Sequence, residues 1–316
     1  MKNKTAIVLA IGLAAGCAGL ARAGDYGTAS GLFLRLPPAA AGTGMGEAGA
    51  AVVAGSPAIF VNPAGLSGVK GGYASFTHSA WLDSLNYNVL SVAVKTKQGG
   101  VIGCGLRYLS YGNMETLDNT GALAGGMSPR DLSAEVGWGK ELSKRRSVGF
   151  SVKYVSARIK RTASTFAADI GVTQRAGRNL FGAVLQNAGG GLKYGAEEYP
   201  LPLNLKLGAG IPYGADLLGV FDINITRGSN PWLAVGGKYT LFVNNDLSMA
   251  LRAGYNTASG DTGGISGFSA GFGLLGRSAS FDYSLRTMGE LGLTHHLGIS
   301  LKWDIVHWET VTLYGK

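Results

Sequence analysis

The stretch "LNLKLGAGI", residues 203–211, decides the fold. Leu203, Leu205 and Leu207 alternate with Asn204 and Lys206, and small or apolar residues continue the pattern to its end. Neighbouring side chains of a β-strand point to opposite faces. A period of two therefore predicts a strand with one apolar face and one polar or glycine-rich face.

The same alternation recurs along the chain. It is clear in "SVGFSVKY" (147–154), "LSMALRAGY" (247–255) and "LGISLKW" (297–303). The pattern predicts about fourteen strands, with boundaries good to a few residues. They lie near 73–80, 87–96, 101–110, 132–141, 147–158, 167–174, 179–187, 203–211, 217–226, 232–241, 246–255, 265–275, 278–286 and 295–304.

The connectors between these segments are sorted by length. Those after the second, fourth, sixth, eighth, tenth and twelfth segments are short: "KQGG", "SKRR", "AGRN", "PYGA", "FVNN" and "GR". Most of the others are longer, such as 111–131 and 188–202, and "RGSNP" after the ninth segment is the exception. Short turns at one rim and longer loops at the other are typical of an outer-membrane β-barrel.

Membrane physics favours the same fold. Strands in lipid must pair all their backbone groups, so the sheet must close into a barrel. We therefore predict an all-β, transmembrane outer-membrane barrel of about fourteen antiparallel strands. Leu205, Leu207, Leu251, Ile299 and Leu301 are expected to face lipid. The charged residues expected in the lumen are Lys206, Arg252, Asp282 and Lys302, together with Asp169. A soluble β-sandwich or solenoid is the alternative, but it need not sort its connectors by length.

The N-terminus predicts export. Lys2 and Lys4 precede an apolar run, and "ARA" (21–23) ends in a small-x-small cleavage pattern, so residues 1–23 are expected to be a cleaved signal peptide rather than a membrane anchor. Cleavage would remove three of the 28 basic residues and none of the 19 acidic ones, which leaves a net charge of +6. Because an exported chain rarely meets nucleic acid, we expect no nucleic-acid partner. The dense basic run "KELSKRRS" is interpreted as a solvated turn.

The sequence contains no clear motif for a cofactor site, a metal site or a catalytic site. "GMGEAG" (44–49) fits G-x-G-x-x-G, but no strand leads into it and no acidic residue follows at the required spacing. His295 and His296 are adjacent, so on a strand they point to opposite faces and make a poor metal site. No nucleophile motif and no carboxylate pair stands out. No enzyme activity, cofactor or metal is predicted.

The stretch "SPAIFVNPAGL" (56–66) precedes the first strand. Ser56 and Asn62 are residue types that cap helices, and Pro57 and Pro63 follow them at the first helical position. Gly65 is expected to take the left-handed conformation that ends a short helical turn. These residues predict a compact element of two capped turns.

Residues 32–66, "LFLRLPPAAAGTGMGEAGAAVVAGSPAIFVNPAGL", resemble the N-terminal signature of the PorV/PorQ family, which is related to the FadL-type outer-membrane barrels. The likeness continues through "AADIGV", "VLQNAGGGLKY", "LRAGY", "FDYSL" and "GELGLTHHLGISLKW". "THHLGISL" departs from the family, which often has an arginine after the histidine. The tail "DIVHWETVTLYGK" also departs, so whether Trp303 or Tyr314 ends the last strand stays open.

The resemblance implies a fourteen-stranded barrel with a small N-terminal plug in its lumen. The expected organisation is a signal peptide (1–23), a plug (24–66), a FadL-like barrel (67–304) and a C-terminal tail (305–316). The plug motif comprises Ser56, Pro57, Asn62, Pro63 and Gly65. An ordinary capped linker before the first strand is the alternative reading of that motif.

The resemblance implies three possible functions. FadL-type barrels pass hydrophobic small molecules across the outer membrane, and this is the leading hypothesis. PorV-type barrels act in type IX secretion, where they bind or shuttle secreted cargo. The third function is purely structural. The partners implied are outer-membrane lipid, the barrel-assembly machinery, and either a hydrophobic small-molecule ligand or a secreted protein cargo.

Overall fold

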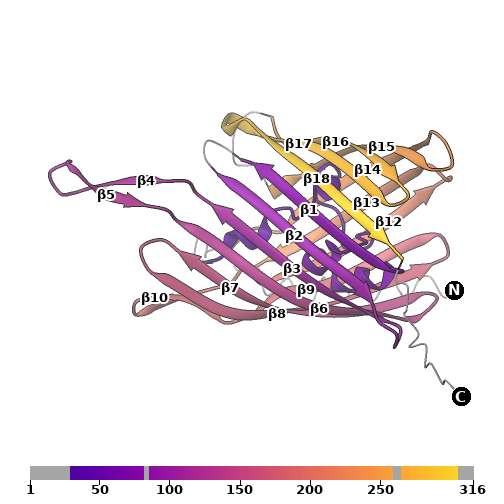
Figure 1. The fold of residues 1–316 in the computed structure, drawn as a ribbon, viewed down its shortest axis with the longest axis horizontal. Helices are drawn as coiled ribbons and strands as arrows, with labels where there is room; N and C mark the ends of the chain where they lie inside the picture. The colour runs from indigo at the N-terminus through magenta and orange to yellow at the C-terminus, as the bar shows by residue number, and fades with distance from the viewer. Residues whose placement is uncertain (1–28, 82–84, 259–264, 305–316) are drawn as a thin grey trace, which may run out of the picture.

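The computed structural model describes residues 29–81, 85–258 and 265–304. Over this part of the chain, fourteen antiparallel strands form one closed barrel, which confirms the predicted fold class (Figure 1). The strands are β1 (Gly72–Ala80), β2 (Asn86–Lys95), β3 (Gly100–Ser110), β6 (Arg130–Ser143), β7 (Arg146–Arg158), β8 (Thr162–Ala176), β9 (Asn179–Gly189), β12 (Asn204–Tyr213), β13 (Leu217–Thr226), β14 (Trp232–Phe242), β15 (Leu247–Asn256), β16 (Ser266–Gly276), β17 (Ala279–Met288) and β18 (Leu293–Trp303).

Each strand pairs with the barrel strands before and after it in the chain, and the first strand closes the ring with the last. The closing register runs from the pair Gly72 and Trp303 to the pair Ala80 and His295. β18 ends at Trp303, whereas the predicted signal peptide, the tail and Tyr314 lie outside the described residues. Closure pairs the edges that an open sheet would leave exposed.

Two of the longer connectors, which were predicted to be loops, contain short hairpins. β4 (Met114–Leu117) pairs with β5 (Leu123–Met127), and β10 (Gly191–Tyr194) pairs with β11 (Glu197–Pro200). The β4–β5 hairpin projects well beyond one rim of the barrel (Figure 1). These segments are too short and irregular for the period of two to stand out.

The outer surface of the barrel is apolar. Leu251, Ile299 and Leu301 lie on it and are 46%, 54% and 52% exposed, whereas Arg252 and Ser300, one residue on, are buried on the inner face. This arrangement suits a wall with lipid outside and a filled lumen inside. No helix among the described residues is long and apolar enough to cross a bilayer.

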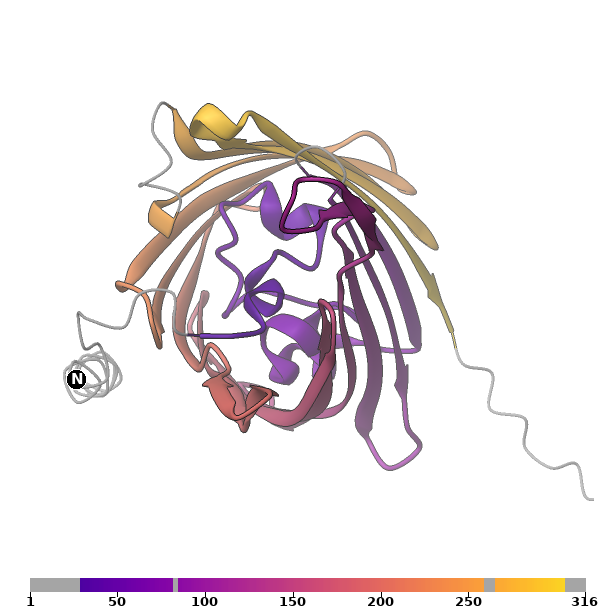
Figure 2. The ribbon, with the colours of Figure 1, turned by 90° about the vertical axis from the view of Figure 1, so that its left-hand side faces the viewer.

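The ring of strands encloses residues 29–69, named here the lumen segment (Figure 2). Its short helices are η2 (Leu32–Arg35), α2 (Ala40–Thr43), α3 (Ala58–Val61) and η3 (Pro63–Gly68). Phe33, Ile59, Phe60 and Leu66 are almost completely buried and belong to a core shared with the inner wall. η3 continues past residue 66, where the predicted plug ended, because its last turn packs on β6 and β7 before β1 begins.

Candidate functional site

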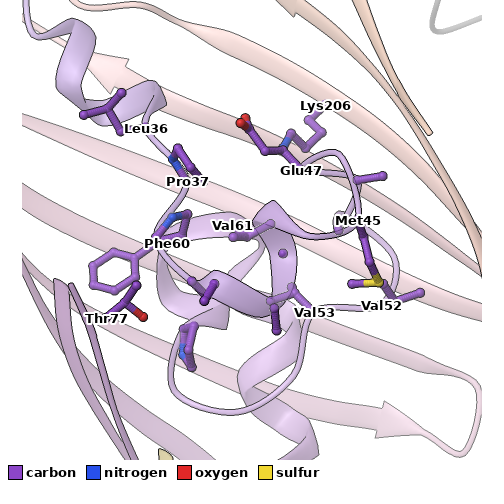
Figure 3. Close-up of a pocket in the computed structure, with 18 of the residues that line it drawn as sticks. Leu36, Pro37, Met45, Glu47, Val52, Val53, Phe60, Val61, Thr77 and Lys206 are labelled. Carbon is purple, nitrogen blue, oxygen red and sulfur yellow. The ribbon is translucent and has the colours of Figure 1, made fainter. Parts of the chain in front are cut away.

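The lumen contains a cavity of about 240 Å³ between the lumen segment and the barrel wall (Figure 3). The lumen segment supplies its apolar side, and the strands supply most of its polar side. The apolar lining includes Leu36, Pro37, Met45, Val52, Val53, Phe60 and Val61. The polar lining includes Ser75, Thr77, Gln186, Asn204, Asn224 and Ser300. A concave, mainly apolar space with a few polar groups is the usual form of a small-molecule site.

Basic side chains outnumber acidic ones around the cavity. Arg35, Arg107, Lys206, Lys238 and Arg252 line it, against Glu47 and Asp282. Arg252 Nη1 lies 2.8 Å from Asp282 Oδ1, and Lys206 Nζ lies 3.9 Å from Asp222 Oδ2.

Two of these cations have no carboxylate within salt-bridge distance. Among the described residues, neither Arg35 nor Lys238 has an acidic oxygen within 4.0 Å of its side-chain nitrogens. Burial lowers the pKa of the Arg35 guanidinium, and nearby Glu47 acts in the opposite direction. The cavity can therefore hold an apolar molecule and still offer a cation to an acidic group.

A buried chain of charges on the inner wall holds the lumen segment from one side. Arg107 Nε donates to Glu135 Oε1 at 3.0 Å, and Lys153 Nζ donates to Asp169 Oδ2 at 2.7 Å. Lys153 also lies 3.7 Å from Glu135 Oε2, so the two ion pairs are joined. Such charges are costly to bury unless each is paired.

Arg107 carries this network to the lumen segment. Its Nη1 donates to the Leu34 carbonyl oxygen at 2.8 Å, and its guanidinium lies 4.9 Å from the centre of the Phe60 ring. Arg107 therefore touches both a charged wall residue and two separate turns of the lumen segment.

Asp222 and Arg286 provide further attachments. Asp222 Oδ2 accepts hydrogen bonds from the backbone N–H groups of Gly49 at 2.7 Å and Ala50 at 3.0 Å. Arg286 forms an ion pair with Glu47. Wall residues thus bind the middle of the lumen segment through its backbone N–H groups and through the Glu47 side chain.

Asn62 caps η3 and also joins it to neighbouring segments. Its Oδ1 accepts from Ala64 N at 3.2 Å, with Pro63 at the first helical position. Its Nδ2 donates to the Ala50 carbonyl at 2.7 Å and to the Val172 carbonyl of β8 at 3.3 Å. A Cβ at Gly171 would overlap the Asn62 amide, so glycine is needed there for this approach.

Three expectations for the motif were wrong. Ser56 makes no capping bond, because its hydroxyl is held by Ser91 of β2: it donates to the Ser91 carbonyl at 3.2 Å and accepts from Ser91 Oγ at 2.9 Å. Pro57 is the N-cap of α3 rather than its first residue. Gly65 lies inside η3 and has no positive φ. A Cβ on Gly65 would come within 3.0 Å of Ala58 Cβ and would overlap the Val53 carbonyl, so close packing explains the glycine.

The remaining predicted residues lie apart from the cavity. Lys302 is on the inner face at the short-turn rim, where it is exposed and its Nζ lies 5.9 Å from the centre of the Tyr73 ring. The two histidines point to opposite faces. His296 bonds Ser79 Oγ at 2.7 Å in the interior, and His295 bonds the Tyr283 hydroxyl at 2.8 Å outside.

The sequence interpretation missed Arg107, Glu135, Lys153, Asp222 and Lys238. The alternation of faces along each strand could have found them. Four of these side chains are buried, and on each strand they alternate with exposed residues of the outer face. This alternation identifies the face of the wall on which a charged residue lies. It does not identify the residue's ion-pair partner, because partners such as Lys153 and Asp169 come from different strands.

A closed fourteen-stranded barrel with an apolar exterior and a filled lumen has the architecture of outer-membrane β-barrels. The fold is that of the FadL-like outer-membrane barrels. It resembles the Pseudomonas putida toluene transporter TodX, with a TM-score of 0.62 and 13% sequence identity over 85% of this chain and 99% of that one.

Two further solved structures share the fold at 13% identity, each matched over 84% of this chain and 98% of its own. They are the Ralstonia pickettii toluene transporter TbuX, with a TM-score of 0.57, and a Pseudomonas aeruginosa FadL homologue, with a TM-score of 0.54. No family model and no curated protein sequence matches the chain.

Proposed function

We propose that this protein is an outer-membrane channel that passes hydrophobic small molecules across the outer membrane of a diderm bacterium. The observation that carries this proposal is the 240 Å³ cavity, enclosed by the barrel and lined on one side by apolar residues of the lumen segment. The related folds of two toluene transporters support it.

The lumen segment acts as the plug of this channel. It fills the ring of strands around the cavity, and wall residues hold it at Leu34, at Glu47 to Ala50 and at Asn62. A molecule entering the cavity therefore contacts plug and wall together, and its onward passage requires the plug to shift.

The cations at the cavity favour a substrate with an acidic group on an apolar body. Lys238 makes no ion pair within the described residues and lines the cavity with Trp232 and Met45. A charged group that is partly buried gains from an opposite charge supplied by a ligand.

Uptake by a deletion strain tests the proposal. Complemented cells would be assayed with labelled long-chain fatty acid and with labelled toluene, which separates acidic from neutral apolar substrates. We expect the deletion to lower uptake of one or both. We expect Lys238→Met to lower fatty-acid uptake alone, with Lys302→Met, a lysine outside the cavity, as the matched control. Unchanged uptake of both compounds in the deletion strain would contradict a transport role.

Secretion-associated cargo binding, the PorV/PorQ side of the sequence resemblance, is the second candidate. One feature favours it: the projecting β4–β5 hairpin exposes Leu117 and Leu123, which are 63% and 65% exposed. Normal uptake in the deletion strain together with lost surface display of secreted proteins would favour this candidate. Removing residues 113–128 should then abolish display while leaving the barrel folded.

A further inference from the structure

A groove crosses the outer face of the barrel over β7, β8, β9 and β12. It has a volume of about 360 Å³ and is lined by Val148, Phe150, Ile170, Val172, Ala183, Leu185 and Leu205, together with backbone at Gly149, Gly171 and Val184. The strand register places Val148, Val172 and Ala183 in one row, with Phe150, Ile170 and Leu185 in the next. Ala183 is the smallest side chain in these rows, which explains the hollow.

The groove leads directly toward a cluster of cations at the short-turn rim. Lys144, Arg145, Arg146, Arg175 and Arg178, named here the basic rim, are all exposed. Arg146 is two residues from Val148 on the same strand, which is about 7 Å along a β-strand. Its Nε donates to Gln174 Oε1, and the pair Arg146 and Gln174 forms the next row below the groove on the outer face.

The basic rim is built from turns that hold one another. Arg175 N donates to the Arg145 carbonyl at 2.7 Å, and Arg178 Nη2 donates to the Gly214 carbonyl of the next turn at 2.8 Å. Within the described ranges, no salt bridge joins any basic-rim residue to a carboxylate. The cluster is therefore a concentration of positive charge without salt bridges at the edge of the apolar wall, with the exposed Glu141 as the one acidic residue of the run "KELSKRRS".

The location of the groove and the basic rim indicates which kind of molecule can bind there. The short turns of an outer-membrane barrel lie at its periplasmic rim, where the apolar wall gives way to the headgroup layer. A molecule that occupies both features must have an apolar chain long enough to lie in the groove and an anionic group at its end. Phosphate suits arginine in particular, because the guanidinium can donate two parallel hydrogen bonds to it.

We propose that this face is a binding site for an anionic phospholipid of the periplasmic leaflet. Its acyl chain lies in the groove, and its phosphate is held by Arg146 with the neighbouring basic rim. The inference does not rest on the transport proposal, because the site lies on the opposite surface of the wall from the cavity. It also gives the run "KELSKRRS" a role beyond that of a solvated turn.

Native mass spectrometry of the full-length protein in detergent tests the site. The probes are phosphatidylglycerol and phosphatidylcholine with identical acyl chains, and inorganic phosphate serves as a competitor. We expect the wild-type protein to retain phosphatidylglycerol preferentially, and excess inorganic phosphate to displace little of it, because phosphate lacks the chain. Each arginine near the headgroup layer contributes about a fivefold effect. Arg145→Gln combined with Arg146→Gln should therefore weaken binding about 25-fold.

Two further variants separate a built site from general attraction. Ala183→Phe fills the groove without changing charge and should also reduce phosphatidylglycerol retention. Arg277→Gln removes a cation from the same rim on the opposite side of the ring and should bind like wild type. A mobility shift on boiling verifies folding of each variant. Equal retention of the two lipids, unaltered binding by Ala183→Phe, or an equal loss in Arg277→Gln would overturn the proposal.

Discussion

At the scale of single residues, Asn62 has two tasks, since it caps η3 and ties that helix to Ala50 and to β8. Loss of a cap side chain typically costs about 0.5–2 kcal/mol. We expect Asn62→Ala to loosen the lumen segment while the barrel stays folded. The measurement is the rate of proteolysis within residues 29–69, alongside the mobility shift on boiling. Ser67→Ala, which removes one hydrogen bond from the same helix, should change the rate less.

The glycine opposite Asn62 offers a complementary test. A Cβ at Gly171 would overlap the Asn62 amide, whereas the nearest heavy atom to a Cβ at Gly219 is 3.8 Å away. Gly171→Ala should therefore displace the lumen segment and raise conductance in planar bilayers. Gly219→Ala should leave conductance as in the wild type. Equal conductance of the two variants would mean that Asn62 does not hold the segment closed.

At the scale of strands, register decides which substitutions the barrel tolerates. Leu251 is in the middle of β15 and faces outward, where an arginine at the bilayer midplane costs about 2–4 kcal/mol. Leu251→Arg should therefore impair assembly. Arg252→Leu is not the matched control, because it would leave the buried Asp282 carboxylate without its ion-pair partner. The double variant Arg252→Leu with Asp282→Leu removes both charges and should assemble, as judged by the mobility shift on boiling. Normal assembly of Leu251→Arg would reject the register.

Some strands of the fold could be predicted from the sequence, and others could not. Strands such as β12 and β15 were predictable because a wall between lipid and lumen imposes a period of two. Hairpins β4–β5 and β10–β11 were not, because they lie outside the wall and lack that constraint. The role of Asn62 followed from local capping rules. The role of Ser56 did not, because its partner Ser91 is 35 residues away in the chain.

At the scale of the whole molecule, the lumen segment and the closed ring have separate sources of stability. The ring is held by backbone hydrogen bonds between strands all the way round. The lumen segment is held by side chains of the wall, among them Asp222. Deleting residues 31–66 should therefore leave a folded barrel and open a large, steady pore in planar bilayers, whereas the wild type stays nearly closed. Unchanged conductance after the deletion would show that these residues do not block the pore.

The seam between β1 and β18 joins the first and last strands of the barrel. It joins Gly72 to Trp303, so the ring cannot close until almost all of the described chain has been made. Pairings so distant in sequence form slowly. A polypeptide truncated before Leu293 would carry two unpaired edges, which invite aggregation and degradation. Closure of the seam thus depends on a complete set of strands, since a chain that lacks β18 keeps both of its edges open.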